Sequence, residues 1–205
     1  MGTALLVSGP PGSGKTTLIR TVLGDLSAQA GGFLTEEIRE GGERIAFRVM
    51  TLDGRSGILA AVRARGGPQV GRYHVDVPTF EAIGIVALEA ATAAADLVVV
   101  DEIGKMELCS PRFLPALEAA LASAKPLLGS ILHAPHPVTD AIKRRPEVEL
   151  YRLSVRNRND LAEAIAARLQ TELGLLARVP PESSPIIDLS RESRPISREP
   201  RENSP

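Results

Sequence analysis

The sequence predicts an α/β fold: a mostly parallel sheet flanked by helices, with an antiparallel β patch inserted early in the chain. Three observations carry this prediction. A short apolar run leads through a Gly-rich loop into an amphipathic stretch over residues 3–26. Residues 31–77 show strands and turns without helical periodicity. Beyond them, apolar runs alternate with amphipathic stretches, which indicates parallel strands connected by helices on both faces of a sheet.

The first strand, loop and helix form a complete phosphate-binding motif. The apolar run at residues 3–8 predicts a strand, and residues 16–26 predict a helix. The pattern G-x-x-x-x-G-K-[ST] fills residues 9–16 between them. Backbone N–H groups of such a loop point at phosphate oxygens, and the helix N-terminus adds partial positive charge. The predicted nucleotide-binding residues are Gly9, Pro10, Pro11, Gly12, Ser13, Gly14, Lys15, Thr16 and Thr17.

Two carboxylates complete the predicted site. Residues 96–102 form a continuous apolar run that ends in Asp101 and Glu102, which is typical of a strand buried on both faces. We expect Lys15 to reach the β- and γ-phosphates, and Thr16 and Asp101 to hold Mg²⁺. Glu102 is positioned in the sequence to orient and deprotonate an attacking water, so Glu102 and Lys15 are the predicted catalytic residues.

The inserted patch is expected between the first helix and the acidic strand. Residues 33–39 and 45–50 predict two strands joined by a Gly-Gly turn. Residues 57–60 and 72–77 predict two more strands.

Helices and strands then alternate to residue 173. We expect Thr79 to cap a helix that runs to about residue 94, and Ser110-Pro111 to begin another. Asn159-Asp160 is expected to cap the last helix, residues 161–173. Buried strands are also expected at residues 127–132 and 148–155.

The chain divides by composition into a domain, residues 1–178, and a tail, residues 179–205. Pro, Ser, Arg and Glu dominate the tail, which has too few apolar residues to offset the entropy of ordering a chain. We therefore expect the tail to be disordered.

The composition limits the partners. The formal net charge is −1 and aromatic residues make up 3% of the chain, so we expect neither a nucleic-acid nor a membrane partner. Cys109 is the only cysteine, which rules out an intramolecular disulfide. No apolar run has the length of a membrane span, and no basic leader precedes the first strand. A cytoplasmic location is expected, and a monomer is favoured.

Several segments together resemble one family, the small P-loop nucleoside-triphosphatases that include a thermophilic enzyme and a human cancer-related enzyme. The segments are GPPGSGKTTL at 9–18, GGFLTEEIR at 31–39, TLDG at 51–54, VGRYHVDV at 70–77, VVVDEIGKMEL at 98–108 and NRND at 157–160. The resemblance covers about residues 3–173 and implies the P-loop NTPase fold. It also implies slow, Mg²⁺-dependent hydrolysis of nucleoside triphosphates to diphosphate and phosphate, with loose base selectivity.

The resemblance assigns nucleotide and metal binding to Lys15 and Thr16, metal support to Asp101 and water activation to Glu102. In one respect the sequence departs from the family. His133 is usually followed there by basic residues, whereas here Ala134-Pro135-His136-Pro137 follow it. A phosphate contact made by such a basic pair is not expected in this chain.

Other residues are possible members of the site, each with an alternative interpretation. His133 ends the strand beside the acidic one, where a polar residue senses the γ-phosphate in related ATPases; an ordinary strand-edge histidine is the alternative. Lys105 and Glu107 follow the acidic strand and either line the site or form a solvated turn. Glu36 and Glu37 lie on a predicted strand that either approaches the metal or, as we expect, presents them on a solvated face. Five arginines are candidates for an arginine finger, and the sequence does not choose among Arg20, Arg39, Arg72, Arg112 and Arg144.

Three other functions fit parts of the pattern. Residues 101–104 match the D-x-x-G pattern of a GTPase, and residues 157–160 nearly match the guanine-reading N-K-x-D, with Arg in place of Lys. A small-molecule or nucleotide kinase would share the phosphate loop, although no arginine-rich lid is evident between the later strands. A nucleotide-gated interaction protein would use the same loop as a switch, and the tail could dock its partner.

Overall fold

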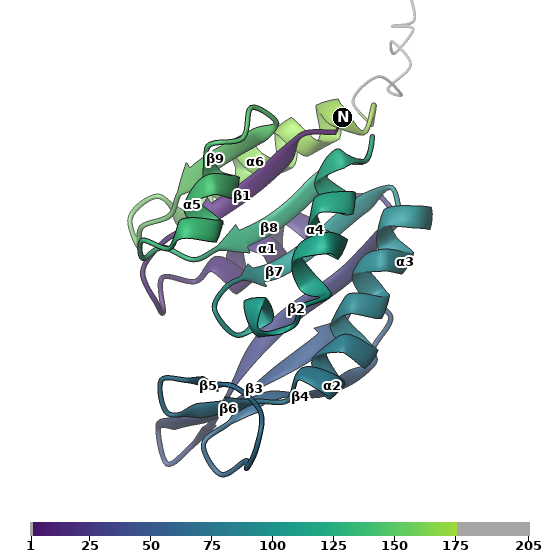
Figure 1. Cartoon of the computed structure of the whole chain (residues 1–205). Coiled ribbons are helices and arrows are strands. Elements are labelled where there is room, and N and C mark those ends of the chain that lie inside the picture. The colour runs from purple at the N-terminus through teal and green to yellow at the C-terminus, as the bar shows by residue number, and fades with distance from the viewer. Residues whose placement is uncertain (1, 176–205) are drawn as a thin grey trace, which may run out of the picture.

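The computed structural model, which describes residues 2–175, contains one sheet of nine strands. The order across the sheet is β5-β6-β4-β3-β2-β7-β8-β1-β9 (Figure 1). The predicted tail at residues 179–205, and its boundary with the domain, lie outside the described residues. The strands are β1 (Ala4–Ser8), β2 (Ala30–Glu40), β3 (Glu43–Thr51), β4 (Ser56–Ala61), β5 (Gln69–Val70), β6 (Tyr73–Val75), β7 (Leu97–Ile103), β8 (Leu127–Ile131) and β9 (Val148–Arg152).

The parallel half of the sheet is built around β1. Ala4 lies beside Leu127 of β8 on one side and Val148 of β9 on the other, and both pairings are parallel. β7 pairs with β8 and with the first half of β2, also in parallel. Because the strands are parallel, their carboxyl ends meet at one edge of the sheet, and loops at that edge form the usual ligand site of α/β proteins.

Helices cover both faces of this half, as the sequence predicted. Leu5 and Val7 of β1 face a core shared with α1 and α6, whereas Ala4 and Leu6 face a core shared with α2 to α5. Figure 1 shows α3, α4 and α5 on the near face and α6 behind the sheet. The helices are α1 (Lys15–Gly24), α2 (Val77–Phe80), α3 (Val86–Ala94), α4 (Phe113–Ala122), α5 (Pro137–Lys143) and α6 (Arg158–Glu172), with a π turn η1 (Glu81–Ile85) and a 3₁₀ turn η2 (Glu107–Cys109).

The predicted antiparallel patch is present, and it continues the main sheet. β2 is eleven residues long. Its first residues pair in parallel with β7, from Ala30 beside Leu97 to Phe33 beside Val100. From Phe33 onward β2 also pairs antiparallel with β3, so one strand connects the hairpins to the parallel half. The predicted strands at residues 33–39, 45–50, 57–60 and 72–77 correspond to β2, β3, β4 and β6.

Three predicted helix starts were wrong. The helical segment that begins at α2 is capped by Asp76, whose carboxylate accepts from the Thr79 N–H at 2.9 Å, so Thr79 is not the cap. α4 begins at Phe113, because Ser110 closes a preceding turn in which its carbonyl accepts from the Phe113 N–H at 3.2 Å. α6 is preceded by Asn157 as its N-cap residue, which puts residues 159–160 in the first turn.

α5 was not predicted at all. It is seven residues long and follows the short loop after β8. Pro137 occupies its first position and Asp140 lies in its first turn, which are favourable for a helix start. A segment this short carries too little periodicity to be recognised beside the more obvious Pro-rich loop.

One helical segment among residues 2–175 is long and apolar enough to cross a membrane by length and composition alone, Val77–Ala94. The expectation that no stretch has this property was wrong. Phe80, Ile85, Leu88 and Ala91 on its buried side belong to the core against the sheet. This is the packing of a core helix in an α/β fold.

Candidate active site

The phosphate loop connects β1 to α1 at the carboxyl edge of the sheet, as predicted. Gly12 and Gly14 adopt φ values of 76° and 93°, in the left-handed region that favours glycine. Gly14 is the N-cap residue of α1, so the loop turns directly into the helix N-terminus. These conformations give the backbone the curl that is needed to point N–H groups inward.

Lys15 lies between the loop and the acidic strand. Its Nζ donates to the Gly9 carbonyl at 3.4 Å and lies 3.8 Å from Oε1 of Glu102. The Lys15 side chain is 12% exposed and that of Glu102 is 31% exposed. The structure thus brings together the two predicted catalytic residues, both reachable from solvent.

Asp101 is buried, with 1% of its surface exposed, and is surrounded by hydroxyl groups. Thr16 Oγ1 donates to its Oδ2 at 2.6 Å, and Ser130 Oγ donates to its Oδ1. Burial raises the pKa of Asp101, while the Ser130 and Thr16 hydrogen bonds and the charge of Lys15 oppose that rise. Ser130 was missed by the sequence analysis, although it is the one polar side chain in the apolar run at residues 127–132.

Glu102 follows Asp101 through a cis peptide bond and faces the open side of the site. Burial raises the pKa of Glu102; the charge of Lys15 opposes this shift, and the charge of Asp101 reinforces it. A carboxylate whose pKa is raised is a better proton acceptor than an ordinary one, provided that it remains ionised at the working pH.

Two further residues after β7 were site candidates, Lys105 and Glu107. Glu107 lies close to Glu102, whereas Lys105 lies outside the cavity over the phosphate loop. A Cβ on Gly104 would lie 2.9 Å from Oε2 of Glu107 and 3.5 Å from Cγ of Glu102. Glu107 is buried, and burial together with the negative charge of Glu102 raises its pKa to about 8. Lys105 is exposed and lines a separate hollow with Leu108.

A cavity of about 600 Å³ opens over the phosphate loop. His133 lines it from the loop after β8 rather than from the strand itself, with Nδ1 3.3 Å from Oγ of Ser8. Ser13 is buried, and its Oγ has no hydrogen-bond partner among the described residues. The predicted residues that line the cavity are Gly9, Pro11, Gly12, Gly14, Lys15, Thr16, Thr17, Glu102 and His133, whereas Pro10, Ser13, Asp101, Lys105 and Glu107 are not among its lining residues.

The opposite wall of the cavity comes from β2 and β3. Glu36 and Glu37 lie in this wall, so the expectation that they only form a solvated strand face was incomplete. Arg44 pairs with Glu37 at 2.6 Å, and its guanidinium lies 5.2 Å from the ring centre of Phe47. Both Arg44 and Phe47 line the cavity and were missed, because nothing in the sequence shows that the first hairpin folds back over the loop.

Among the five arginines left open by the sequence, only Arg20 lines the cavity in the described structure. Arg39 pairs with Glu37 and Arg112 with Glu89. Arg72 donates to the carbonyl of Arg44 and lies near Glu43, and Arg144 ends α5.

The oxygen atoms at this site fit a hard divalent cation. Residues 2–175 contain no group of three or more His, Cys, Asp or Glu residues that could hold a metal by themselves. Mg²⁺ is usually held by one or two protein oxygens together with substrate phosphates and water. Thr16 and Asp101, in direct contact beside the phosphate loop, supply such a donor pair.

Comparisons with known proteins agree with this architecture. The nucleoside-triphosphatase THEP1 of Thermotoga maritima is 43% identical over 170 residues, which cover 83% of this chain and 97% of that protein. The corresponding protein of Pyrococcus abyssi is 41% identical over 172 residues, covering 82% and 93%.

Two solved structures share the fold. THEP1 from the hyperthermophile Aquifex aeolicus has a TM-score of 0.76 and 33% identity, covering 82% of this chain and 99% of that one. The solution structure of a human cancer-related nucleoside triphosphatase has a TM-score of 0.69 and 35% identity, covering 83% and 98%. A sequence model of the family described as NTPase matches residues 4–166, which include every strand, the phosphate loop and both carboxylates. This chain therefore belongs to the NTPase family of P-loop nucleoside-triphosphatases.

Proposed function

We propose that this nucleoside-triphosphatase hydrolyses the β–γ phosphoanhydride bond with Mg²⁺ as cofactor and accepts several bases. The observation that carries the proposal is the position of Glu102, 3.8 Å from Lys15 Nζ and in the wall of the cavity over the phosphate loop. A water in that cavity has a carboxylate on one side and the γ-phosphate site on the other.

Each residue has a distinct role in this reaction. The loop N–H groups and Lys15 bind the β- and γ-phosphates, and Thr16 and Asp101 would hold Mg²⁺, which would neutralise phosphate charge. Glu102 accepts a proton from water as the water oxygen bonds to the γ-phosphorus. The bond from phosphorus to the β–γ bridging oxygen then breaks, which leaves nucleoside diphosphate and inorganic phosphate. His133, hydrogen-bonded to Ser8, faces the same cavity and is our candidate for contacting the γ-phosphate.

Loose base selectivity follows from what surrounds the loop. Phe47 is the one aromatic residue that lines the cavity within residues 2–175. Asn157, the first residue of the near match to a guanine-reading motif, already makes hydrogen bonds within the protein. Its Oδ1 accepts from the Ser154 N–H at 2.8 Å, and its Nδ2 donates to the Arg152 carbonyl at 3.0 Å. This use of Asn157 counts against a guanine-specific switch.

The test is phosphate release from ATP, GTP, CTP and UTP, with Mg²⁺ or with EDTA, by the wild type and by Glu102→Gln. We expect Mg²⁺-dependent release, with specificity constants for the four nucleotides within about tenfold, or about 1.4 kcal/mol. Glu102→Gln should retain nucleotide binding and lose about 10²- to 10⁴-fold in turnover. Glu163→Gln, on the exposed side of α6, is the matched control and should keep full activity.

Other outcomes point to the rival functions. Wild-type turnover by Glu102→Gln would show that another group activates the water. Labelled phosphate that appears on an added nucleoside or alcohol would identify a kinase, and a preference of a hundredfold or more for GTP would indicate a GTPase. Turnover that appears only with a protein partner would favour a nucleotide-gated switch.

The proposal also covers the cellular location and the oligomeric state of the protein. With 24 basic and 25 acidic residues, the chain offers no strong charge to nucleic acid or membranes. We expect a cytoplasmic monomer, and light scattering on the purified chain with and without nucleotide checks the oligomeric state.

A further inference from the structure

Arg158 lies directly against the phosphate loop. It is the first residue of α6, and its side chain reaches Gly14, the N-cap residue of α1. If Gly14 carried a Cβ, that atom would lie 2.8 Å from Nη1 of Arg158, 3.3 Å from its Cδ and 3.7 Å from its Cζ. The absence of a side chain at Gly14 therefore makes room for this guanidinium beside the backbone that cradles phosphate.

Arg158 is exposed, and no carboxylate among residues 2–175 pairs with it. Within residues 2–175 no hydrogen bond or ion pair holds its guanidinium, whereas Arg168, on the same helix, contacts Glu149 and Glu172. Lys15 lies next to Gly14 in the loop and begins α1. Positive charge thus approaches the loop from two sides, although only Lys15 has a carboxylate of the site, Glu102, nearby.

The helix termini add to this positive field. α1 and α6 pack in the same core, through residues such as Ile19 and Ile165, and both begin at the carboxyl edge of the sheet. The N-terminus of each helix carries partial positive charge, which disfavours an arginine at the first position. Asp160 is the only acidic residue in the first turn of α6. An anion bound at Gly14 would relieve this repulsion.

We propose that Arg158 is a nucleotide-binding residue, which contacts the phosphates common to nucleoside tri- and diphosphates. This inference rests on the proposed function and extends it. In the sheet, β9 flanks β1 on one side, and β7 with Glu102 lies on the other side beyond β8. Arg158, which follows β9, therefore approaches the loop from the side opposite the reacting γ-phosphate. A guanidinium can donate two parallel hydrogen bonds to phosphate oxygens, which an ammonium cannot match.

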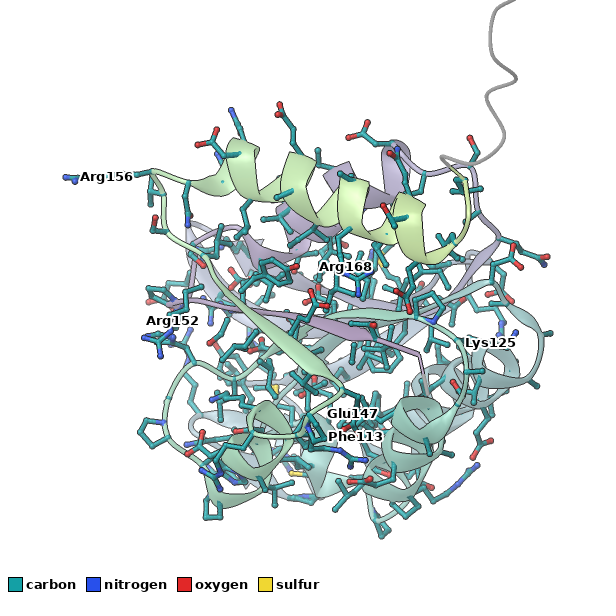
Figure 2. All side chains as sticks on the ribbon, turned by 90° about the horizontal axis from the view of Figure 1, so that it is seen from above. Phe113, Lys125, Glu147, Arg152, Arg156 and Arg168 are labelled. Atoms are coloured by element: carbon teal, nitrogen blue, oxygen red, sulfur yellow. The ribbon has the colours of Figure 1, made fainter. Side chains whose placement is uncertain are left out.

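Such a contact also accounts for loose base selectivity. Phosphates are identical in all four nucleotides, so binding energy supplied by Arg158 raises affinity without regard to the base. Arg156 supplies a matched control two residues earlier in the same turn. Figure 2 shows Arg156 extending away from the body of the molecule, whereas the side chain of Arg158 lies on Gly14.

The experiment is calorimetric titration of the full chain with ADP and with inorganic tripolyphosphate, each with Mg²⁺. The variants are Arg158→Ala, Arg158→Lys and Arg156→Ala. We expect Arg158→Ala to raise Kd at least tenfold for both ligands and Arg158→Lys to raise it by less. Arg156→Ala should stay within twofold of wild type. The melting temperatures of all variants without ligand should lie within about 2 °C of wild type.

Three results would overturn the proposal. The first is an Arg158→Ala variant whose affinities equal those of Arg156→Ala. The second is an effect confined to ADP, which would assign Arg158 to the ribose or base. The third is a melting temperature lowered in both Arg158 variants together with the affinity, which would make the role structural. A wild type that binds ADP through Arg158 but hydrolyses no nucleoside triphosphate would refute the proposed hydrolysis and leave this contact standing.

Discussion

Ser130 holds Asp101, the metal ligand that we propose, through a hydrogen bond from its hydroxyl group. Together with Thr16, it donates a hydrogen bond to a carboxylate that is otherwise buried. Partners behind a metal ligand fix its orientation, and their loss typically costs 10- to 100-fold in metal affinity or activity. We expect Ser130→Ala to raise the Mg²⁺ concentration for half-maximal phosphate release about 10- to 100-fold. Thr171→Ala, near the end of α6, is the control, and an unchanged Mg²⁺ requirement in Ser130→Ala would contradict this role.

Lys15 is the other residue whose removal has a clear expected outcome. Its ammonium group is the side-chain cation that lies between Gly9 and Glu102. Lys15→Ala should abolish hydrolysis and weaken nucleotide binding, because charge-assisted hydrogen bonds to the phosphates are lost. Lys105→Ala removes an exposed lysine outside the cavity and should behave as wild type. Phosphate release and ADP titration measure both effects, and near-normal turnover by Lys15→Ala would refute the phosphate-loop assignment.

Glu107 should make stability depend on pH. Its pKa is raised from 4.5 to about 8 in the folded protein, so the folded state holds a proton that the unfolded state releases. The free energy of unfolding therefore falls as pH rises from about 4.5 to 8, by at most about 1.4 kcal/mol per pH unit. Glu107→Gln cannot lose this proton, and its unfolding free energy should fall less steeply. Urea unfolding at pH 5, 6, 7 and 8 measures the two slopes, and parallel slopes would mean that Glu107 does not titrate in this range.

At the scale of elements, three phenylalanines join the two halves of the sheet. Phe113 of α4 lies 6.4 Å from the ring of Phe33 on β2 and 5.7 Å from that of Phe80 on α2. All three rings are fully buried. Phe113→Ala should lower the free energy of unfolding by about 3–5 kcal/mol, because it leaves a cavity at this junction. Val155→Ala, at a site 81% exposed, should change it by less than about 0.5 kcal/mol.

Denaturant unfolding followed by circular dichroism measures both variants. A loss below about 1 kcal/mol for Phe113→Ala would mean that the cluster collapses to fill the space, and that the junction does not depend on this ring.

Strands were predicted more accurately than helix ends, for a physical reason. Residues 97–100 are apolar throughout and residues 127–132 nearly so, because both sheet faces are covered there, and this property is visible in the sequence. Helix starts depend on a choice among nearby capping residues. Asp76 rather than Thr79 accepts the cap hydrogen bond, and Pro78 follows it in the first turn. Both Asp and Thr are favourable N-cap residues, so two nearby candidates compete for the same helix start.

Site residues, too, divide into those that a local sequence pattern identifies and those that only the fold brings together. The loop residues and the carboxylate pair were predicted because their spacing along the chain is the signal. Ser130, Arg44 and Phe47 reach the site only through the register of β7 with β8 and the fold of the first hairpin. Arg158 is brought to Gly14 by α6 packing beside α1. No local pattern identifies contacts between residues so far apart in the sequence.

For the whole molecule, the sequence predicts that residues 179–205 can be removed. Every strand that the structure describes, and every residue of the proposed site, lies within residues 2–175. A chain ending at residue 178 should keep its hydrolysis rate, and its melting temperature should stay within about 5 °C of the full chain, which corresponds to roughly 1–2 kcal/mol for this size. Differential scanning calorimetry and phosphate release compare the two chains. A larger melting drop would show that the tail packs on the domain, and lost activity without a melting change would show that it gates the site.

The position of β1 has a consequence for synthesis on the ribosome. β1 is the first of the nine strands to be made, yet its neighbours in the sheet are β8 and β9. Ala4 can therefore pair with Leu127 and Val148 only after those residues have been made. Closing loops this long is slow, and contacts far apart in sequence form late. The nascent chain therefore carries a complete nucleotide motif whose supporting strand β1 has no neighbours in the sheet until β8 and β9 have been made. Competence to bind nucleotide should therefore arise only after β9 has been made.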